Sequence, residues 1–118
     1  MDQKTNKTYN LEERTYEFAL AVAIYCKKLP RTISNLEYVK QVIRSSGSPA
    51  SNYIEANESL GKKDFQMRIK ICRKEAKETA LWLRLIMNTN PEKFTEEGNK
   101  LIQEANELKK IFSAILNK

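Results

Sequence analysis

The sequence predicts an all-α fold, an antiparallel up-down-up-down four-helix bundle, and three observations support this prediction. The 118 residues include only three glycines and three prolines, whereas an all-β fold needs turn residues at roughly every 8–12 positions. Apolar residues make up 41% of the chain, which suffices for one hydrophobic core in a domain of this size. Apolar positions recur at spacings of three and four in four separate stretches, and this is the period of an α-helix.

The first predicted helix spans about residues 11–28 and follows a polar N-terminus, residues 1–10, that we expect to be flexible. Lys27 and Lys28 suit its last turn, where the helix dipole favours cations, and Pro30 would end it. The predicted core positions on this helix are Leu11, Thr15, Phe18, Val22, Tyr25 and Leu29.

The second stripe runs through residues 45–49 (SSGSP), a segment whose composition could also mark a break between two helices. Pro49 removes one backbone hydrogen bond and should kink or end a helix. The 3-4 rhythm keeps its phase on both sides, however, so we expect one helix over about 34–59, bent near Gly47-Pro49. Gly61 would end this helix as its C′ residue. The predicted core positions are Leu36, Val39, Ile43, Ser46, Ala50, Tyr53, Asn57 and Leu60.

The third stripe is the most regular, because seven positions alternate by four and three without interruption, as coiled-coil-like packing requires. Asn88, Asn90 and Pro91 would end this helix. Its predicted core positions are Phe65, Ile69, Cys72, Ala76, Thr79, Leu83 and Ile86.

The fourth helix is predicted to begin at Thr95, a suitable N-cap, with Glu96 and Glu97 in the first turn, where the helix dipole favours carboxylates. Because the connectors between the helices are short, sequential helices should be antiparallel neighbours. We expect residues 11–118 to form a single bundle domain. The predicted core positions on the fourth helix are Leu101, Ala105, Leu108, Phe112 and Ile115.

The residue inventory argues against an enzyme. The chain has no histidine, which removes the commonest general base and most zinc sites. Its three glycines are too far apart to build a phosphate-cradling loop. Glu75 and Glu78 lie one helical turn apart, but di-iron bundles require a Glu-x-x-His pair, so we interpret them as an ion-paired or solvated face. We therefore expect no catalytic residues, no metal site and no cofactor.

The two cysteines, Cys26 and Cys72, stand far apart and form no CxxC motif. We expect reduced thiols in a cytoplasmic protein, with a disulfide between them as the alternative. An apolar run of about 18 residues, which a membrane-spanning helix needs, is absent, so we expect no membrane association.

The positive charge is concentrated in one segment of the chain. The net charge is +6, and residues 62–84 hold eight basic and three acidic residues, a local excess of +5. Such a face could bind RNA or DNA with little sequence preference and strong salt dependence. A solvated face that keeps the protein soluble is the alternative. The candidate nucleic-acid-binding residues are Lys62, Lys63, Arg68, Lys70, Arg73, Lys74 and Lys77.

Two of the predicted helices are apolar beyond a single stripe, which indicates a further partner such as another subunit. A wide core stripe in a thick bundle is the alternative explanation. The additional apolar residues are Ala19, Ala21, Ala23 and Ile24 in the first helix, and Leu81, Trp82, Leu85 and Met87 in the third.

Several short motifs together resemble the bacterial four helix bundle protein family, also called 23S rRNA intervening-sequence proteins. The resemblance covers about residues 14–115, and none of its motifs is catalytic. The motifs are 16–19 (YEFA), 28–30 (KLP), 41–48 (QVIRSSGS), 51–56 (SNYIEA), 63–65 (KDF), 74–79 (KEAKET), Trp82-Leu83, 104–108 (EANEL) and Ile111-Phe112.

The resemblance implies a four-helix bundle that assembles into a ring-like homopentamer. A distant relative, the accessory variability determinant of diversity-generating retroelements, binds a reverse transcriptase and nucleic acid. Pro49 departs from the family pattern, in which a small or β-branched residue is common at this position. The residues that match the family's polar signature, which we interpret as structural or interface residues, are Arg44, Asn52, Glu55, Lys74, Glu75 and Glu78.

We therefore expect a non-enzymatic homo-oligomer that binds nucleic acid through the basic face of the third helix. The alternative is a structural or adaptor module that binds a protein partner such as a reverse transcriptase.

Overall fold

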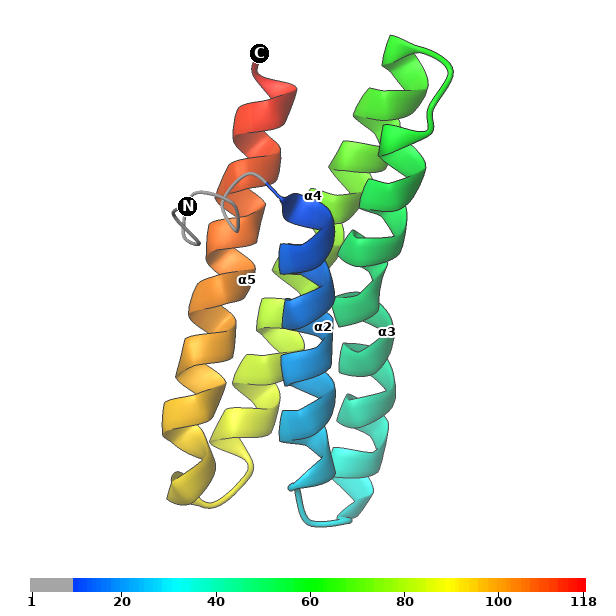
Figure 1. Ribbon diagram of the computed structural model, residues 1–118. Helices are drawn as coiled ribbons and strands as arrows, with labels where there is room; N and C mark the ends of the chain where they lie inside the picture. Colours follow the sequence, from blue (N-terminus) through cyan, green and yellow to red (C-terminus); the bar gives the residue numbers. More distant parts are fainter. Residues whose placement is uncertain (1–9) are drawn as a thin grey trace.

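The computed structural model describes residues 10–118, in which every regular element is a helix (Figure 1). The helices alternate in direction, so the predicted antiparallel four-helix bundle is confirmed. The stretch predicted as a flexible N-terminus lies outside the described residues except for Asn10, whose side chain caps the first helix by accepting a hydrogen bond from the amide of Glu13. The elements are α2 (Leu11–Lys27), α3 (Ile33–Asn57), α4 (Lys62–Asn88), the 3₁₀ turn η1 (Glu92–Phe94) and α5 (Thr95–Leu116).

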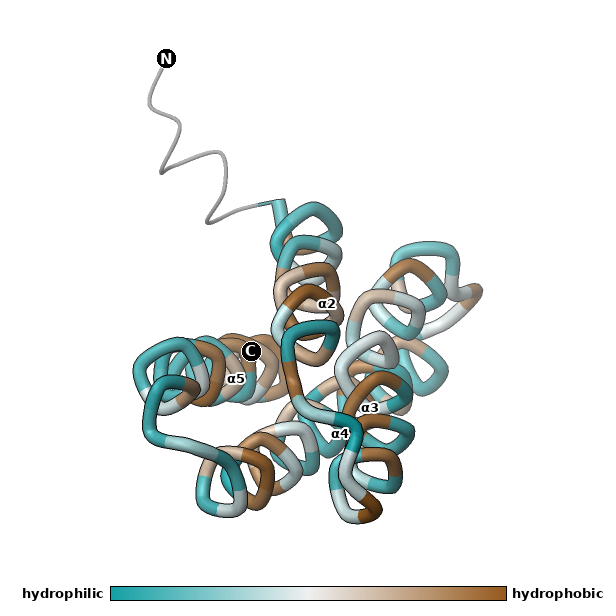
Figure 2. The backbone as a smooth tube through the Cα atoms, turned by 90° about the horizontal axis from the view of Figure 1, so that it is seen from below, coloured by the Kyte–Doolittle hydropathy of each residue, from teal (hydrophilic) through white to brown (hydrophobic). Residues whose placement is uncertain are grey.

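The four helices pack unequally around one core. α4 makes extensive contacts with both α3 and α5, whereas α2 packs mainly against α3 and touches α5 less. Figure 2 looks along the bundle and shows α3 and α5 on either side of α2 and α4. None of the helices in the described part of the chain is long and apolar enough to cross a bilayer.

The predicted core stripes of α2, α4 and α5 are confirmed. All six predicted positions of α2 are buried, although Leu29 lies just beyond the end of the helix. In α4 and α5 only the end positions Phe65 and Ile115 are partly exposed, and both still pack against the core. The 3-4 spacing of apolar residues predicted the buried positions of these helices correctly, because their inner faces consist largely of apolar residues.

α3 runs without interruption through Pro49, so the prediction of one long helix is confirmed, while a bend near Gly47-Pro49 stays a prediction. The predicted core stripe of α3 is only partly confirmed. Ser46 is buried and Val39 and Tyr53 pack against the core, but most of the aliphatic members lie on the flank of the helix. Leu36 and Ile43 are 41% and 42% exposed, and Leu60 lies beyond the helix in solvent. Besides Ser46, the buried residues of α3 are Asn35, Val42, Ser45, Pro49 and Ala56, none of which was predicted.

The inner face of α3 carries polar and small side chains, because the helix packs closely against α4. The hydroxyls of Ser45 and Thr79 lie 2.9 Å apart across this contact, and the Cys72 thiol lies 3.5 Å from the carbonyl oxygen of Pro49. Near the start of α3, the side-chain nitrogen of Asn35 donates a 2.7 Å hydrogen bond to the side-chain oxygen of Asn90, which lies just after α4. The buried side chains of Asn35 and Ser45 therefore have hydrogen-bond partners, which makes a polar face compatible with burial.

Two predicted helix ends are wrong. α3 ends at Asn57, and Gly61 is instead the N-cap of α4, with an extended backbone (φ −165°, ψ 167°). Phe94 rather than Thr95 is the N-cap of α5, and Thr95 is already the first residue of the helix. The chain is helical before this point because the turn η1 leads directly into α5.

A contact between α2 and α5 depends on the absence of a side chain at Gly98. The buried hydroxyl of Tyr25 donates a 2.9 Å hydrogen bond to the carbonyl oxygen of Phe94. A Cβ atom at Gly98 would lie 2.8 Å from this hydroxyl and 3.3 Å from the side chain of Met87. Because its hydrogen bond holds the hydroxyl in place, Tyr25 cannot move away from an added methyl group without losing that bond.

We expect Gly98→Ala to destabilise the protein by about 1–2 kcal/mol, although alanine is the better helix former, because overpacking outweighs helix propensity here. Tyr25→Phe alone should cost about 1 kcal/mol through the lost hydrogen bond. In the Gly98→Ala background the same Tyr25→Phe change should cost nothing or stabilise, since it removes the clashing oxygen. Urea denaturation of the four proteins measures this coupling, and additive effects would contradict the contact.

Candidate nucleic-acid interface

All the cations of α4 except Arg68 lie on one side of the helix, away from the core. Residues seven apart in a helix fall nearly in line, because two turns contain about 7.2 residues. Lys63, Lys70, Lys77 and Arg84 have this spacing, and all four are exposed. The remaining cations of this side flank the line. We call the whole set, which is Lys62, Lys63, Lys70, Arg73, Lys74, Lys77 and Arg84, the basic face.

Six of the seven predicted nucleic-acid-binding residues belong to the basic face, and Arg68 does not. Arg68 is turned toward α3, where its guanidinium donates a 3.0 Å hydrogen bond to the side-chain oxygen of Asn52. Arg84 belongs to the face although the prediction omitted it, and its seven-residue spacing from Lys77 was the signal that could have identified it. Within residues 10–118, the basic face has no ion pair to any acidic side chain.

The family's polar signature includes an ion-pair network between α3 and α4. Arg44 of α3 donates a 2.7 Å hydrogen bond to the nearly buried Glu75, and a second to Glu78 one turn further along α4. The indole nitrogen of Trp82 also donates to Glu78, at 3.1 Å. The hydrogen bond with Glu75, and with it the charge of both carboxylates, holds the pKa of Arg44 above its usual value. Both carboxylates on this side of α4 are therefore paired with Arg44 of α3 and not with the basic face.

The second polar contact between these helices is built around Asn52. Its side-chain nitrogen donates to the carbonyl and the hydroxyl of Ser48, at 3.1 and 2.9 Å, while its oxygen accepts from Arg68. Glu55 lies exposed on α3 and joins neither contact. Lys74, which also matches the signature, lies on the basic face. Four of the signature residues, Arg44, Asn52, Glu75 and Glu78, thus hold α3 against α4.

The two cysteines are free thiols that are poor candidates for nucleophiles. Both are buried, and burial raises the pKa of Cys26 to about 11 and that of Cys72 to about 12. Since only the thiolate is strongly nucleophilic, both groups are unreactive at neutral pH. No cluster of potential metal ligands occurs among the described residues.

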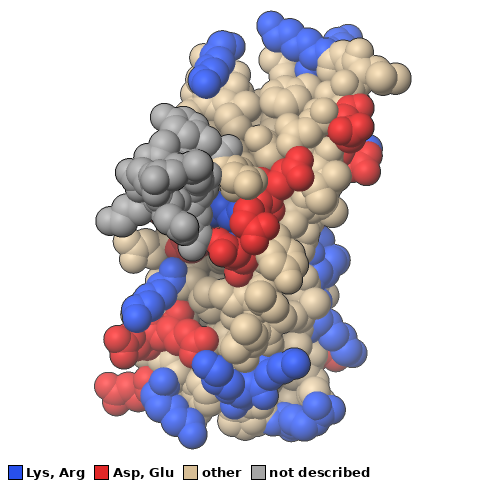
Figure 3. Space-filling view, in the orientation of Figure 1, with Lys and Arg blue, Asp and Glu red and all other residues tan. Residues whose placement is uncertain are grey.

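A second surface, formed by α2 and α3, is apolar. Leu20 and Ile24 of α2 are 45% and 46% exposed, and Leu36 and Ile43 of α3 are exposed to a similar degree. Figure 3 shows a largely uncharged area on this side of the molecule, with Lys and Arg side chains gathered below it. We call these four residues the apolar face.

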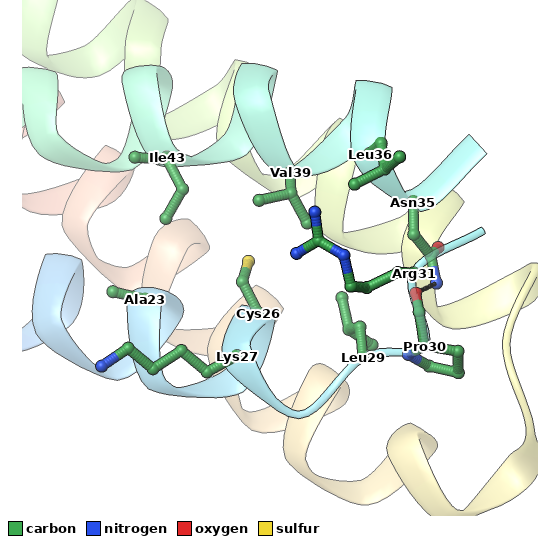
Figure 4. Close-up of a pocket in the computed structure, with 10 residues that line it drawn as sticks. All are labelled: Ala23, Cys26, Lys27, Leu29, Pro30, Arg31, Asn35, Leu36, Val39 and Ile43. Atoms are coloured by element: carbon green, nitrogen blue, oxygen red, sulfur yellow. Dashed lines mark hydrogen bonds between the residues drawn. The ribbon is translucent and has the colours of Figure 1, made fainter. Parts of the chain in front are cut away.

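A pocket of about 400 Å³ lies between the end of α2 and the start of α3, and Leu36 and Ile43 of the apolar face are among the residues that line it. In Figure 4 the Cys26 side chain points into this pocket, and Arg31 reaches back over it toward Val39. Arg31 and Lys27, which also lines the pocket, have no ion pair within the described part of the chain. The pocket thus combines apolar walls with positive charge at its rim.

Comparison with known proteins places these features in a family. The model of the family described as 23S rRNA-intervening sequence protein matches residues 7–114. Among solved structures, the chain is similar to a protein of unknown function from the S23 ribosomal protein family of Bacteroides thetaiotaomicron VPI-5482. The two share 27% sequence identity with a TM-score of 0.80, over 91% of this chain and 98% of the other. Comparison with curated proteins found no match.

We expect Arg44→Met to destabilise the protein by about 1–2 kcal/mol, because it leaves the nearly buried carboxylate of Glu75 without its partner. The cost stays below that of a fully buried pair, since Arg44 is half exposed. Adding Glu75→Met should restore part of the loss by removing the buried charge. Lys40→Met is the matched control on the same helix, where the ion pair is exposed. If Arg44→Met costs no more than Lys40→Met in chemical denaturation, the network does not stabilise the fold.

Proposed function

The chain belongs to the 23S rRNA-intervening sequence protein family, and from this premise we propose that it is a non-enzymatic, cytoplasmic homo-oligomer that binds nucleic acid through the basic face. The observation that carries the proposal is the set of seven cations on one side of α4, none of them paired with an acidic residue in the described part of the chain. Phosphate groups are the ligands that such unpaired lysines and arginines bind.

The composition of the basic face favours binding to the backbone of a nucleic acid over recognition of its bases. Lysine, the commonest residue of the face, is a flexible point charge that contacts phosphates without fixed geometry. Each phosphate contact releases condensed counterions, so affinity should fall steeply with salt and depend little on sequence. Glu75 and Glu78 face α3, where Arg44 pairs with both, so they do not form ion pairs with the cations of the basic face.

The apolar face supports the homo-oligomeric part of the proposal. Its four aliphatic side chains come from two neighbouring helices and are each more than 40% exposed. An exposed cluster of this kind is typical of a surface that another protein covers. The family resemblance implies that the cover is a further copy of the chain in a pentameric ring.

A second candidate function, an adaptor for a protein partner such as a reverse transcriptase, is supported by the pocket between α2 and α3. Its apolar walls and the unpaired cations Lys27 and Arg31 at its rim would suit a partner segment that combines aliphatic and acidic residues. Capture of a specific partner that survives nuclease treatment would favour this candidate over nucleic-acid binding.

Removing two charges from the basic face should weaken nucleic-acid binding. We expect Lys70→Gln/Lys77→Gln to lower affinity for a generic labelled nucleic acid by about tenfold or more, and to reduce the salt slope of log K by about 1.4–1.8. Fluorescence anisotropy between 50 and 200 mM salt measures both quantities. The control Lys40→Gln/Lys100→Gln removes the same charge from exposed positions on α3 and α5. Equal losses in the two variants would contradict the assignment of the site to α4.

The oligomer should depend on the apolar face. Light scattering of the wild-type protein should give about five times the 13.7 kDa of one chain. Ile24→Glu should dissociate the assembly, since it buries a charge at an apolar contact. Leu81→Glu, at a similarly exposed position of α4, is the control and should leave it intact. A wild-type monomer, or dissociation by Leu81→Glu alone, would refute this interface.

A further inference from the structure

The cations of α4 form a row along one uninterrupted helix, and each seven-residue step turns the row by about 20°. Lys63 and Arg84 are 21 residues apart within one uninterrupted helix, which corresponds to about 31 Å at 1.5 Å per residue. Lys70 and Lys77 stand between them at intervals of about 10 Å. The ion pairs of Arg44 and the core stripe of α4 prevent the helix from turning about its own axis. The helix therefore keeps the order and spacing of these residues when a ligand binds, although each side chain is flexible.

The basic face offers no surface on which a base could stack. Phe65 and Trp82 are the aromatic residues of α4, and both are partly buried against the core. The Trp82 ring lies 6.1 Å from the ring of Tyr38 on α3 and its nitrogen is bonded to Glu78, so it is turned away from the cations. The exposed uncharged residues beside the cations are the aliphatic Met67 and Leu81. Proteins that hold single strands combine cations with exposed aromatic side chains, and this combination is missing here.

A double helix matches both properties of the face. It is a stiff rod that carries one negative charge per roughly 1.7 Å of its axis, and one turn is roughly 34–36 Å long. The cation line of about 31 Å is therefore close to one turn in length. A flexible single strand would have to be straightened along the line without any gain from stacking. The same cations also release more counterions from a duplex than from a single strand.

Building on the nucleic-acid binding proposed above, we infer that the ligand class of this face is the phosphate backbone of double-stranded nucleic acid. Because flexible lysines dominate the face, we expect phosphate contacts to outweigh contacts to the bases. An RNA duplex and a DNA duplex share this backbone chemistry, and separate arms of the experiment distinguish them.

The test compares a 20-base-pair RNA duplex, a 20-base-pair DNA duplex and non-self-complementary single strands of equal length, by fluorescence anisotropy at 50 mM salt. If about five cations are engaged, the larger counterion release alone favours duplexes by roughly tenfold. We expect this preference for at least one of the two duplexes, and the arm in which it occurs identifies the natural class. A single strand that binds as tightly as both duplexes would overturn the inference.

Met67→Trp provides a gain-of-function arm, because it places an aromatic ring at an exposed position among the cations. Stacking on this ring should raise affinity for the single strands by about fivefold or more and leave duplex affinity nearly unchanged. An equal rise for both ligands would contradict the inference. Failure of every nucleic acid to bind at 50 mM salt would instead refute the proposed function itself. The Lys70→Gln/Lys77→Gln variant must lose duplex binding more than Lys40→Gln/Lys100→Gln, which confirms that the preference belongs to this face.

Discussion

The orientation of α4 about its own axis governs most of what this protein presents to its surroundings. Seven positions with strict 3-4 spacing turn one side of the helix into the core, six of them buried and Phe65 partly so. Arg44 then holds the adjoining acidic side against α3. What remains is a narrow outer arc, and it carries seven of the eight cations between residues 62 and 84. A rotation of one residue step, about 100°, would bury lysines and expose the core, so packing alone enforces the position of the charge.

The close approach of α3 to α4 has a second effect on the opposite flank of α3. Serines and Pro49 occupy the inner face, where the two helices meet, and larger side chains would hold them apart. Leu36 and Ile43 are thereby left on the side toward α2, half exposed. The polar inner side of α3 and its exposed aliphatic side chains thus both follow from the close packing of α3 against α4. The α3 half of the apolar face is therefore a consequence of this packing, whereas Leu20 and Ile24 come from α2.

The sequence predicted the helices better than it predicted their inner faces. Periodicity located the core of α2, α4 and α5, where buried residues are mostly apolar. It located only part of the inner face of α3, because a buried Asn35 or Ser45 looks like a surface residue until its partner is known. These partners are Asn90, just after α4, and Thr79 on α4. The basic face followed from spacing along a single helix. Spacing could not show that Arg68 lies outside the basic face, because its partner Asn52 is 16 positions away in the chain. The N-cap of α5 was predicted one residue too late, because the three-residue turn η1 before it is too short to produce a periodic pattern.

The contact between Tyr25 and Gly98 links two positions that lie far apart in the sequence. Neither residue can change freely while the other stays, because the hydroxyl occupies the space that a side chain at position 98 would need. Homologous chains should therefore inherit the two positions together. In a relative that has phenylalanine in place of Tyr25, a larger residue than glycine should be better tolerated at position 98. Correlated substitution at these two sites would be an evolutionary record of how closely α2 and α5 have remained packed.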